Sequence, residues 1–323
     1  MLDLLYGAAV GARRRWYERH PEARRRLRQP VISIGNLSFG GTGKTPVARL
    51  VAEHLLARDE RPAILSRGYG RRITDAGATV VADGTRVLAD FDHAGDEPLM
   101  LARAVPGAIV VVAEDRHLAG VLAEERLGAT VHVLDDGFQH LRLMRDLDVL
   151  VTWPGEIPSG RVFPRGVLRE RPAAAARAHV AVVMDTDEAM ARSEAWALGV
   201  SQALGATRVV HVPAVPPAFA IAGIGNPDQF FDSLRVAGVD LRGTHTFRDH
   251  HRYDRRDLDG VAHEVRAVGA EVVLTTAKDA VKLEAAVGVP FSWTVVPLTL
   301  ELDQASTLYD SIDAALARAR EAA

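Results

Sequence analysis

The stretch from Val31 to Thr45, which reads V-I-S-I-G-N-L-S-F-G-G-T-G-K-T, restricts the fold of this chain more than any other part of its sequence. An apolar β-branched run leads into a glycine-rich segment. Beyond that segment, apolar residues recur three and four positions apart, at Val47, Leu50, Val51 and Leu55. This order predicts a strand, a loop and a helix, which is the local structure that a phosphate-binding loop requires.

The glycine-rich segment has the chemistry for contact with phosphate groups. Glycines let backbone N–H groups converge on phosphate oxygens without side-chain clashes, and the following helix directs its positive end toward the same oxygens. We expect Lys44 to reach the β- and γ-phosphates of a nucleoside triphosphate and the Thr45 hydroxyl to bind Mg²⁺. The predicted nucleotide-binding residues are Gly40, Gly41, Thr42, Gly43, Lys44 and Thr45.

One position departs from the full phosphate-loop pattern G-x-x-x-x-G-K-[ST], because this chain has Ser38 where the pattern has its first glycine. The alternative interpretation is a glycine-rich turn that carries a surface lysine. We favour the phosphate loop, because G-T-G-K-T between a strand and a helix seldom arises for structural reasons alone.

Composition limits the remaining possibilities. The length of 323 residues predicts two domains, and the net charge of −3 gives no field that favours nucleic acid as a partner. The absence of cysteine excludes disulfides and thiolate metal sites and fits a reducing compartment. No apolar run approaches the roughly 20 residues of a membrane-spanning helix. The sequence leaves the oligomeric state open and is compatible with a monomer.

Short apolar runs alternate with helical patterns along most of the chain. Such alternation predicts an α/β protein with a mostly parallel sheet and helices on both faces, as in phosphate-loop NTPases. The prolines between residues 213 and 217 mark the expected boundary to a second, smaller α/β domain. We therefore predict an N-terminal segment at 1–30, a phosphate-loop domain at 31–215 and a smaller domain at 216–323 that closes a cleft.

The N-terminal segment, residues 1–30, is strongly basic. It holds eight arginines and three acids, with leucines, tyrosines and a tryptophan between them. A basic segment with apolar anchors suits the surface of an anionic bilayer. An arginine-rich helix that packs on the surface of the domain would have the same composition, and the residues alone do not separate the two.

Two pairs of acidic residues stand at the ends of predicted secondary-structure elements, one at the end of a strand and one at the start of a helix. Asp135 and Asp136 end an apolar run, in the manner of a Walker B strand whose carboxylate binds Mg²⁺. Asp96 and Glu97 stand at a predicted helix start, where an aspartate can also act as an N-terminal cap. A loop with two adjacent histidines, at 249–251, offers a base, an orienting partner or a metal ligand.

Eight segments occur in order between residues 35 and 283: G-N-L-S-F-G-G-T-G-K-T-P, S-R-G-Y-G-R, G-D-E-P, L-D-D-G-F-Q-H, L-R-E, G-I-G-N-P, F-R-D-H-H-R-Y and T-T-A-K-D-A-V-K-L. Together they closely resemble the tetraacyldisaccharide 4′-kinases, the lipid A kinases of Gram-negative bacteria. The resemblance implies transfer of the γ-phosphate of ATP to the 4′-hydroxyl of an acylated disaccharide 1-phosphate. It also implies a peripheral position on the anionic, cytoplasmic face of the inner membrane.

The resemblance also implies roles for single residues. Asp96 matches the carboxylate that takes the proton from the sugar hydroxyl, and a histidine of the loop, His250 in preference to His251, matches its partner. Glu97, Asp135 and Asp136 match acids around the Mg²⁺ site, together with Thr45.

Two other functions are compatible with a phosphate loop. The first is an ATPase or GTPase switch, although the chain lacks the N-K-x-D motif of most GTPases. The second is a peripheral membrane-binding protein that nucleotide regulates, which would bind nucleotide and liposomes without making a phosphorylated lipid.

Overall fold

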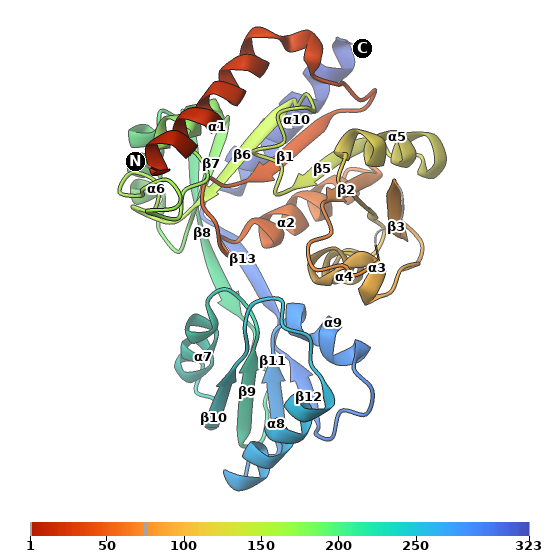
Figure 1. Ribbon diagram of the computed structural model, residues 1–323, viewed down its shortest axis with the longest axis vertical. Helices are drawn as coiled ribbons and strands as arrows, with labels where there is room; N and C mark the ends of the chain where they lie inside the picture. Colours follow the sequence, from red (N-terminus) through yellow and green to blue (C-terminus); the bar gives the residue numbers. More distant parts are fainter. Residues whose placement is uncertain (1, 74–76, 323) are drawn as a thin grey trace.

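The structure, a computed structural model, describes residues 2–73 and 77–322. It contains two sheets, and Figure 1 shows them one above the other, joined by the long strands β8 (Gln202–Val210) and β13 (Leu298–Leu302). We call the part of the chain around the first sheet the large domain and the part around the second the small domain.

The large domain contains a nine-stranded sheet in the order β13-β8-β7-β6-β1-β5-β2-β4-β3. Its inner strands are parallel, and the two edge strands β3 and β13 run antiparallel to their neighbours. The bounds of the strands not yet given are β1 Val31–Gly35, β2 Pro62–Ser66, β3 Ala78–Asp83, β4 Ile109–Ala113, β5 Val131–Asp135, β6 Leu147–Thr152 and β7 Val180–Met184.

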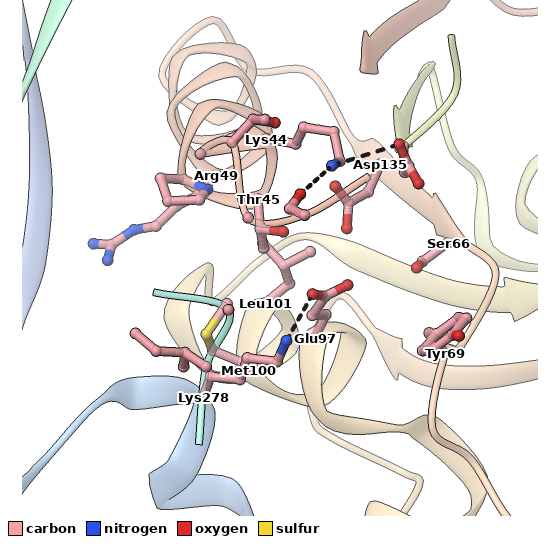
Figure 2. Close-up of a pocket in the computed structure, with 18 of the residues that line it drawn as sticks. Lys44, Thr45, Arg49, Ser66, Tyr69, Glu97, Met100, Leu101, Asp135 and Lys278 are labelled. Atoms are coloured by element: carbon pink, nitrogen blue, oxygen red, sulfur yellow. Dashed lines mark hydrogen bonds and ion pairs between the residues drawn. The ribbon is translucent and has the colours of Figure 1, made fainter. Parts of the chain in front are cut away.

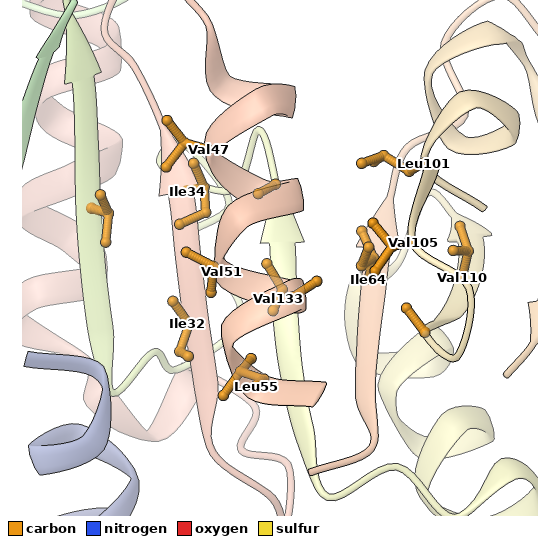
Figure 3. Close-up of a cluster of buried hydrophobic side chains, with 14 of the residues drawn as sticks. Ile32, Ile34, Val47, Val51, Leu55, Ile64, Leu101, Val105, Val110 and Val133 are labelled. Carbon is orange, nitrogen blue, oxygen red and sulfur yellow. The ribbon is translucent and has the colours of Figure 1, made fainter. Parts of the chain in front are cut away.

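Helices cover both faces of the large sheet. On one face, residues of α2, α4 and α10 share a buried cluster with Ile32 and Ile34 of β1, and Figure 3 shows Val47, Val51 and Leu55 of α2 against these strands. On the other face, α5 and α6 pack in two separate clusters. The helix bounds are α1 Leu2–Arg19, α2 Lys44–Leu56, α3 Phe91–Ala94, α4 Asp96–Ala104, α5 Arg116–Leu127, α6 Glu188–Leu198 and α10 Ala305–Glu321, with short 3₁₀ helices at Pro21–Ala23 and Pro172–Arg177.

The small domain contains a four-stranded parallel sheet in the order β10-β9-β11-β12. Its strands are β9 Ala218–Ala222, β10 Leu241–Thr246, β11 Val272–Thr275 and β12 Trp293–Val295. Its helices are α7 Pro227–Val236, α8 Arg255–Ala267 and α9 Ala277–Ala285. The predicted α/β fold with a mostly parallel sheet and helices on both faces is therefore confirmed.

The predicted C-terminal bound of the small domain is wrong. We placed all of 216–323 there, but β13 pairs with β8 in the large sheet. The helix α10 then buries Leu308, Ile312 and Leu316 in the core of the large domain. The four-residue spacing of these side chains predicts a helix correctly but does not say which sheet that helix covers, because any apolar sheet face can receive such a stripe.

Candidate active site

A cavity of about 1360 Å³ lies at the carboxyl ends of the large-sheet strands and opens between the two domains. In parallel α/β sheets, ligands bind at this edge. The six predicted nucleotide-binding residues all line the cavity, and so do Glu97, Asp135, Asp136 and His250. Figure 2 shows Lys44, Thr45 and Asp135 on one side of it, with Glu97 and Lys278 opposite.

The backbone of the phosphate loop requires glycine at two positions. Gly40 and Gly43 have φ values of 121° and 87°, in the region that residues with a side chain rarely adopt. Gly43 also precedes α2, where an added Cβ would lie 3.0 Å from the Cε atom of Met184. The loop can thus bring its N–H groups and the start of α2 toward a phosphate group, as predicted.

Ser38, the departure from the phosphate-loop pattern, is fully buried beneath the loop. The side-chain amide of Asn36 donates to the Ser38 hydroxyl at 3.1 Å and to the Thr42 hydroxyl at 2.7 Å. These two hydrogen bonds connect the beginning of the loop to its middle. The serine at this position therefore takes part in the hydrogen bonds that stabilise the loop conformation, and its side chain does not enter the cavity.

Lys44 and Asp136 lie next to each other within the large domain. The Nζ atom of Lys44 is 3.7 Å from Oδ1 of Asp136, and the Arg169 guanidinium donates to both carboxylate oxygens of Asp136 at 2.8 and 2.9 Å. Burial alone would raise the pKa of Asp136, but the charges of Lys44 and Arg169 lower it below its ordinary value. Asp136 is thus an ionised carboxylate with cationic partners.

The pKa of Asp135, at the end of β5, is shifted in the opposite direction. Its side chain is buried, and its Oδ1 atom has no hydrogen-bond partner among the residues that the structure describes. Burial, followed by the nearby carboxylates of Glu97 and Asp136, raises the pKa of Asp135 to about 7. A buried carboxylate oxygen without a partner is the kind of group that a cation stabilises. No group of three or more His, Cys, Asp and Glu residues within 2–73 and 77–322 has the geometry of a metal site by itself.

Asp96 and His250 meet across the two domains. The Nδ1 atom of His250 lies 2.8 Å from Oδ2 of Asp96, and Asp96 is only 2% exposed. The N-terminal cap of α4 is Gly95, not Asp96, and the second oxygen of Asp96 accepts the backbone N–H of Glu97 at 3.1 Å. The carboxyl group of Asp96 is therefore directed at a histidine and not committed to capping.

The pair favours its charged form. Burial alone would raise the pKa of Asp96, but the hydrogen bond with His250 and the charge of Lys278 together lower it. The hydrogen bond with Asp96 raises the pKa of His250 above its ordinary value. His250 has a φ of 59°, which is uncommon for a residue with a side chain, and Gly70 lies beside the pair, where an added Cβ would be 3.7 Å from Asp96.

The second histidine of the loop, His251, points elsewhere. Its Nε2 atom is 2.7 Å from Oδ2 of Asp257 within the small domain, and its ring stacks on Phe247. The structure therefore brings His250, and not His251, to Asp96.

The sequence assigned no role to three cationic residues at this site. Lys278 contacts Glu97 from the small domain, and Arg252 contacts Asp92 and the carbonyl of Gly70. Arg116 is a buried arginine that lines the cavity. Lys278 and Arg252 stand in two of the eight segments quoted above, but nothing in those segments shows that their side chains cross to the other domain.

Known proteins resemble this chain over most of its length. A family model described as tetraacyldisaccharide-1-P 4′-kinase matches residues 1–317. A tetraacyldisaccharide 4′-kinase of Geobacter metallireducens is 42% identical over 301 residues, which cover 88% of this chain and 87% of that protein. One of Koribacter versatilis is 36% identical and covers 96% of both chains. A crystal structure of LpxK from Aquifex aeolicus in complex with ATP has a TM-score of 0.77 and 28% identity, and the match covers 98% of this chain and 97% of that one.

Proposed function

The chain belongs to the tetraacyldisaccharide-1-phosphate 4′-kinase family, and on this premise we infer that it is the kinase that phosphorylates a tetraacyldisaccharide 1-phosphate in lipid A biosynthesis. The γ-phosphate of ATP passes to the 4′-hydroxyl of the lipid. The observation that carries this proposal is the Asp96–His250 pair, in which His250 lines the same cavity as the phosphate loop and contacts the buried Asp96.

ATP binds to the phosphate loop in this proposal. The N–H groups of residues 40–45 and the start of α2 surround the triphosphate, and Lys44 turns from Asp136 toward the β- and γ-phosphates. Phosphoryl transfer depends mainly on positioning and on neutralising oxygen charge, which is what a loop of this kind supplies.

The residues present fit Mg²⁺. Asp135 offers a buried oxygen without another partner among the described residues, and Thr45 stands in the first turn of α2 at the same cavity. We propose that Thr45 and Asp135 hold the ion, with Glu97 and Asp136 beside it, because hard oxygen donors suit Mg²⁺ and the phosphates complete its shell. When bound, the ion neutralises charge on the phosphate oxygens.

Asp96 accepts the proton of the 4′-hydroxyl. Against the effect of burial, the hydrogen bond with His250 and the charge of Lys278 hold the pKa of Asp96 below its ordinary value, so we propose that Asp96 acts as a base together with His250 and not alone. His250 shares the proton through the 2.8 Å hydrogen bond, and the pair behaves as one titrating unit.

The sugar phosphate requires cations that the triphosphate does not use. Arg116 is buried, and this burial, followed by the charge of Arg67, lowers its pKa to about 10. An Nη1 atom of Arg71 is buried without a partner among residues 2–73 and 77–322. We propose that these crowded arginines bind the anionic 1-phosphate, which would relieve their mutual repulsion, while Arg169 stays with Asp136.

The helix α1 is the proposed membrane contact. Leu2, Leu4 and Leu5 are 69%, 64% and 62% exposed, and no helix among the described residues has the length and hydropathy to cross a bilayer. Exposed leucines next to arginines suit the surface of an anionic membrane. We propose that α1 contacts the cytoplasmic face of the inner membrane, where a lipid A precursor would be available as substrate.

Incubation with [γ-³²P]ATP and a tetraacyl disaccharide 1-phosphate, followed by chromatography of the lipid, tests the function. A labelled lipid that depends on the enzyme is expected. ATP hydrolysis without a labelled lipid would point to a switch ATPase, and binding to nucleotide and liposomes without either reaction would point to a nucleotide-regulated membrane protein.

Sedimentation with liposomes tests the membrane contact separately. We expect wild-type binding to anionic vesicles to fall with added salt and to weaken when Leu4 and Leu5 are both changed to serine. Trp196 is a matched control, since it is 84% exposed on α6. If Trp196→Ser weakens binding as much as the double change, α1 is not the contact.

A further inference from the structure

Lys278 stands at the first turn of α9, in a part of the small domain that a buried polar network holds in place. At the centre of that network is Asp279, which has no exposed surface. It accepts hydrogen bonds from the backbone N–H of Gly223 at 2.9 Å, from the Thr276 hydroxyl at 2.8 Å and from the Tyr253 hydroxyl at 3.1 Å. The backbone that carries Lys278 is therefore fixed relative to its own sheet.

From this fixed position the side chain of Lys278 crosses to the large domain. Its Nζ atom lies 3.1 Å from Oε1 of Glu97 and 3.8 Å from Oδ2 of Asp96, and Figure 2 shows it directed at Glu97. The same atom is 3.1 Å from Oδ1 of Asp249 in the small domain. One ammonium group thus stands among three carboxylates, and only 14% of the Lys278 side chain is exposed.

Asp249 connects this cluster to the histidine of the catalytic pair. Its Oδ1 atom, which contacts Lys278, also accepts the backbone N–H of His250 at 3.0 Å. Lys278 is therefore linked to both members of the pair: to Asp96 directly, and to His250 through Asp249. Burial by itself would lower the pKa of Lys278, but the carboxylates of Glu97, Asp96 and Asp249 have the larger, opposite effect. The pKa is therefore raised, and the amine stays charged.

We propose that Lys278 is a positioning residue for phosphoryl transfer. Its ammonium group links Asp96 and Glu97 of the large domain to Asp249 of the small domain, and this link keeps Asp96 and His250 within hydrogen-bonding distance of each other. This inference rests on the proposed kinase function. Without the ammonium group, the nearly buried Asp96 would share the interface with two other carboxylates and keep only His250 as a cationic partner, and the loss of a cation from a buried carboxylate is unfavourable. A displacement of about 1 Å at a reacting group can reduce a rate by about 10²-fold.

The chain contains no cysteine, which allows a direct test of the charge. In the variant Lys278→Cys we expect kcat to fall about 10²-fold and the KM for ATP to stay within about twofold. Alkylation with 2-bromoethylamine then converts this single thiol to a side chain with the length and charge of lysine. We expect it to restore most of kcat, whereas alkylation with iodoacetamide, which adds no charge, should not. Mass spectrometry shows when each modification is complete.

A second variant separates this role from general adhesion of the domains. Arg103 of α4 forms an ion pair with Glu284 of α9, so it joins the same two helices without contacting Asp96 or His250. We expect Arg103→Met to keep kcat within about twofold of wild type.

Three results would overturn the inference: a nearly normal kcat in Lys278→Cys, complete aminoethylation without recovery, or an equal loss in Arg103→Met. A loss that lies mainly in the KM for ATP would also overturn it, because Lys278 would then bind nucleotide. The wild-type chain in the same assay reports on the function itself, and a wild type without labelled lipid would overturn both proposals.

Discussion

The two walls of the cleft, which are the facing surfaces of the large and the small domain, carry opposite charges around the proposed catalytic pair Asp96–His250. The large domain brings carboxylates, at Asp92, Asp96 and Glu97, and the small domain brings cationic partners for them, at Arg252, His250 and Lys278. The phosphate loop differs from both, because its glycines, Lys44 and Asp136 belong to the large domain alone. The proposed nucleotide site is therefore assembled within one domain, whereas the proposed proton-accepting pair forms only where two domains meet.

This difference has a consequence for the energetics of closure. If the two domains separated, Asp92, Asp96 and Glu97 of the large domain would lose these cationic partners, and Lys278 would keep only Asp249 of its own domain. We propose that closure of the cleft pairs these charges, because a buried charge that has lost its partner is strongly unfavourable. Variants of the phosphate loop and variants of the domain interface should therefore differ in their effects. Phosphate-loop variants should weaken the affinity for ATP as well as lower kcat, whereas interdomain variants should lower kcat and leave that affinity nearly unchanged.

The largest effect is expected at the interdomain pair. Asp96→Ala and His250→Ala should each lower kcat by roughly 10²–10⁴-fold, the range for loss of acid–base assistance, with little change in ATP affinity. The double variant should be scarcely worse than either single one, because residues that act as a unit are not additive. Steady-state kinetics with the lipid substrate measure all three.

Asp90 provides the control for this comparison, since its side chain caps α3 and accepts the N–H of His93. Asp90→Ala should leave kcat nearly unchanged. If Asp96→Ala behaves like Asp90→Ala, Asp96 has only a local structural role. If the two single losses multiply, Asp96 and His250 act independently.

The next effect is expected at the phosphate loop. Lys44→Ala should lower kcat by about 10²–10³-fold, comparable to the loss of one strong donor to a developing anion, and should also weaken ATP binding. A fluorescent ATP analogue measures the affinity. Near wild-type turnover would contradict the phosphate-loop assignment, and a loss in kcat with unchanged affinity would remove the distinction between the two walls.

The sequence predicts the phosphate loop, which lies within one domain, much better than it predicts the contacts between the two domains. A phosphate loop is a local pattern, so residues 31–45 predicted their strand, loop and helix, and β5 ended at Asp135 as expected. The contact between Asp96 and His250 joins positions 154 residues apart, and no local periodicity encodes it; only the family resemblance suggested the pair. Lys278 is missed for the same reason, since a lysine after a strand looks like any surface residue until the second domain is placed.

A smaller effect is expected where the walls meet further from the pair. Arg252 contacts Asp92, and its guanidinium lies 4.4 Å from the ring centre of Phe91. Both charged side chains are partly exposed, so this pair contributes about 0.2–1 kcal/mol. Arg252→Asp should lower kcat/KM by roughly two- to fivefold, the loss that such a pair supports, and the charge swap with Asp92→Arg should recover part of it. Loss without recovery in the swap would show that Arg252 acts through Gly70 and not through charge.

The last effect concerns stability and leaves kcat aside, and it contrasts a histidine of the small domain with one of the large domain. His250 has a raised pKa, whereas burial and the charge of Arg116 lower the pKa of His140 in the large domain to about 4. Between that value and the ordinary 6.5, the unfolded chain binds more protons at this residue than the folded chain does. Falling pH therefore favours unfolding, by on the order of 2 kcal/mol once the partial exposure of the ring is allowed for.

In His140→Gln this contribution is absent. The stability of the variant relative to wild type should therefore improve as the pH falls from 8 to 5, which thermal unfolding would record as a relative gain of a few degrees in Tm. Wild type and variant are compared at each pH, so that groups titrating in both chains cancel. His263 is a suitable second site, because it lies on an exposed part of α8: His263→Gln should show the same difference in Tm at both pH values. A His140→Gln difference that does not change with pH would mean that His140 is protonated as readily in the folded chain as in the unfolded one, and that burial and the charge of Arg116 do not hold it neutral.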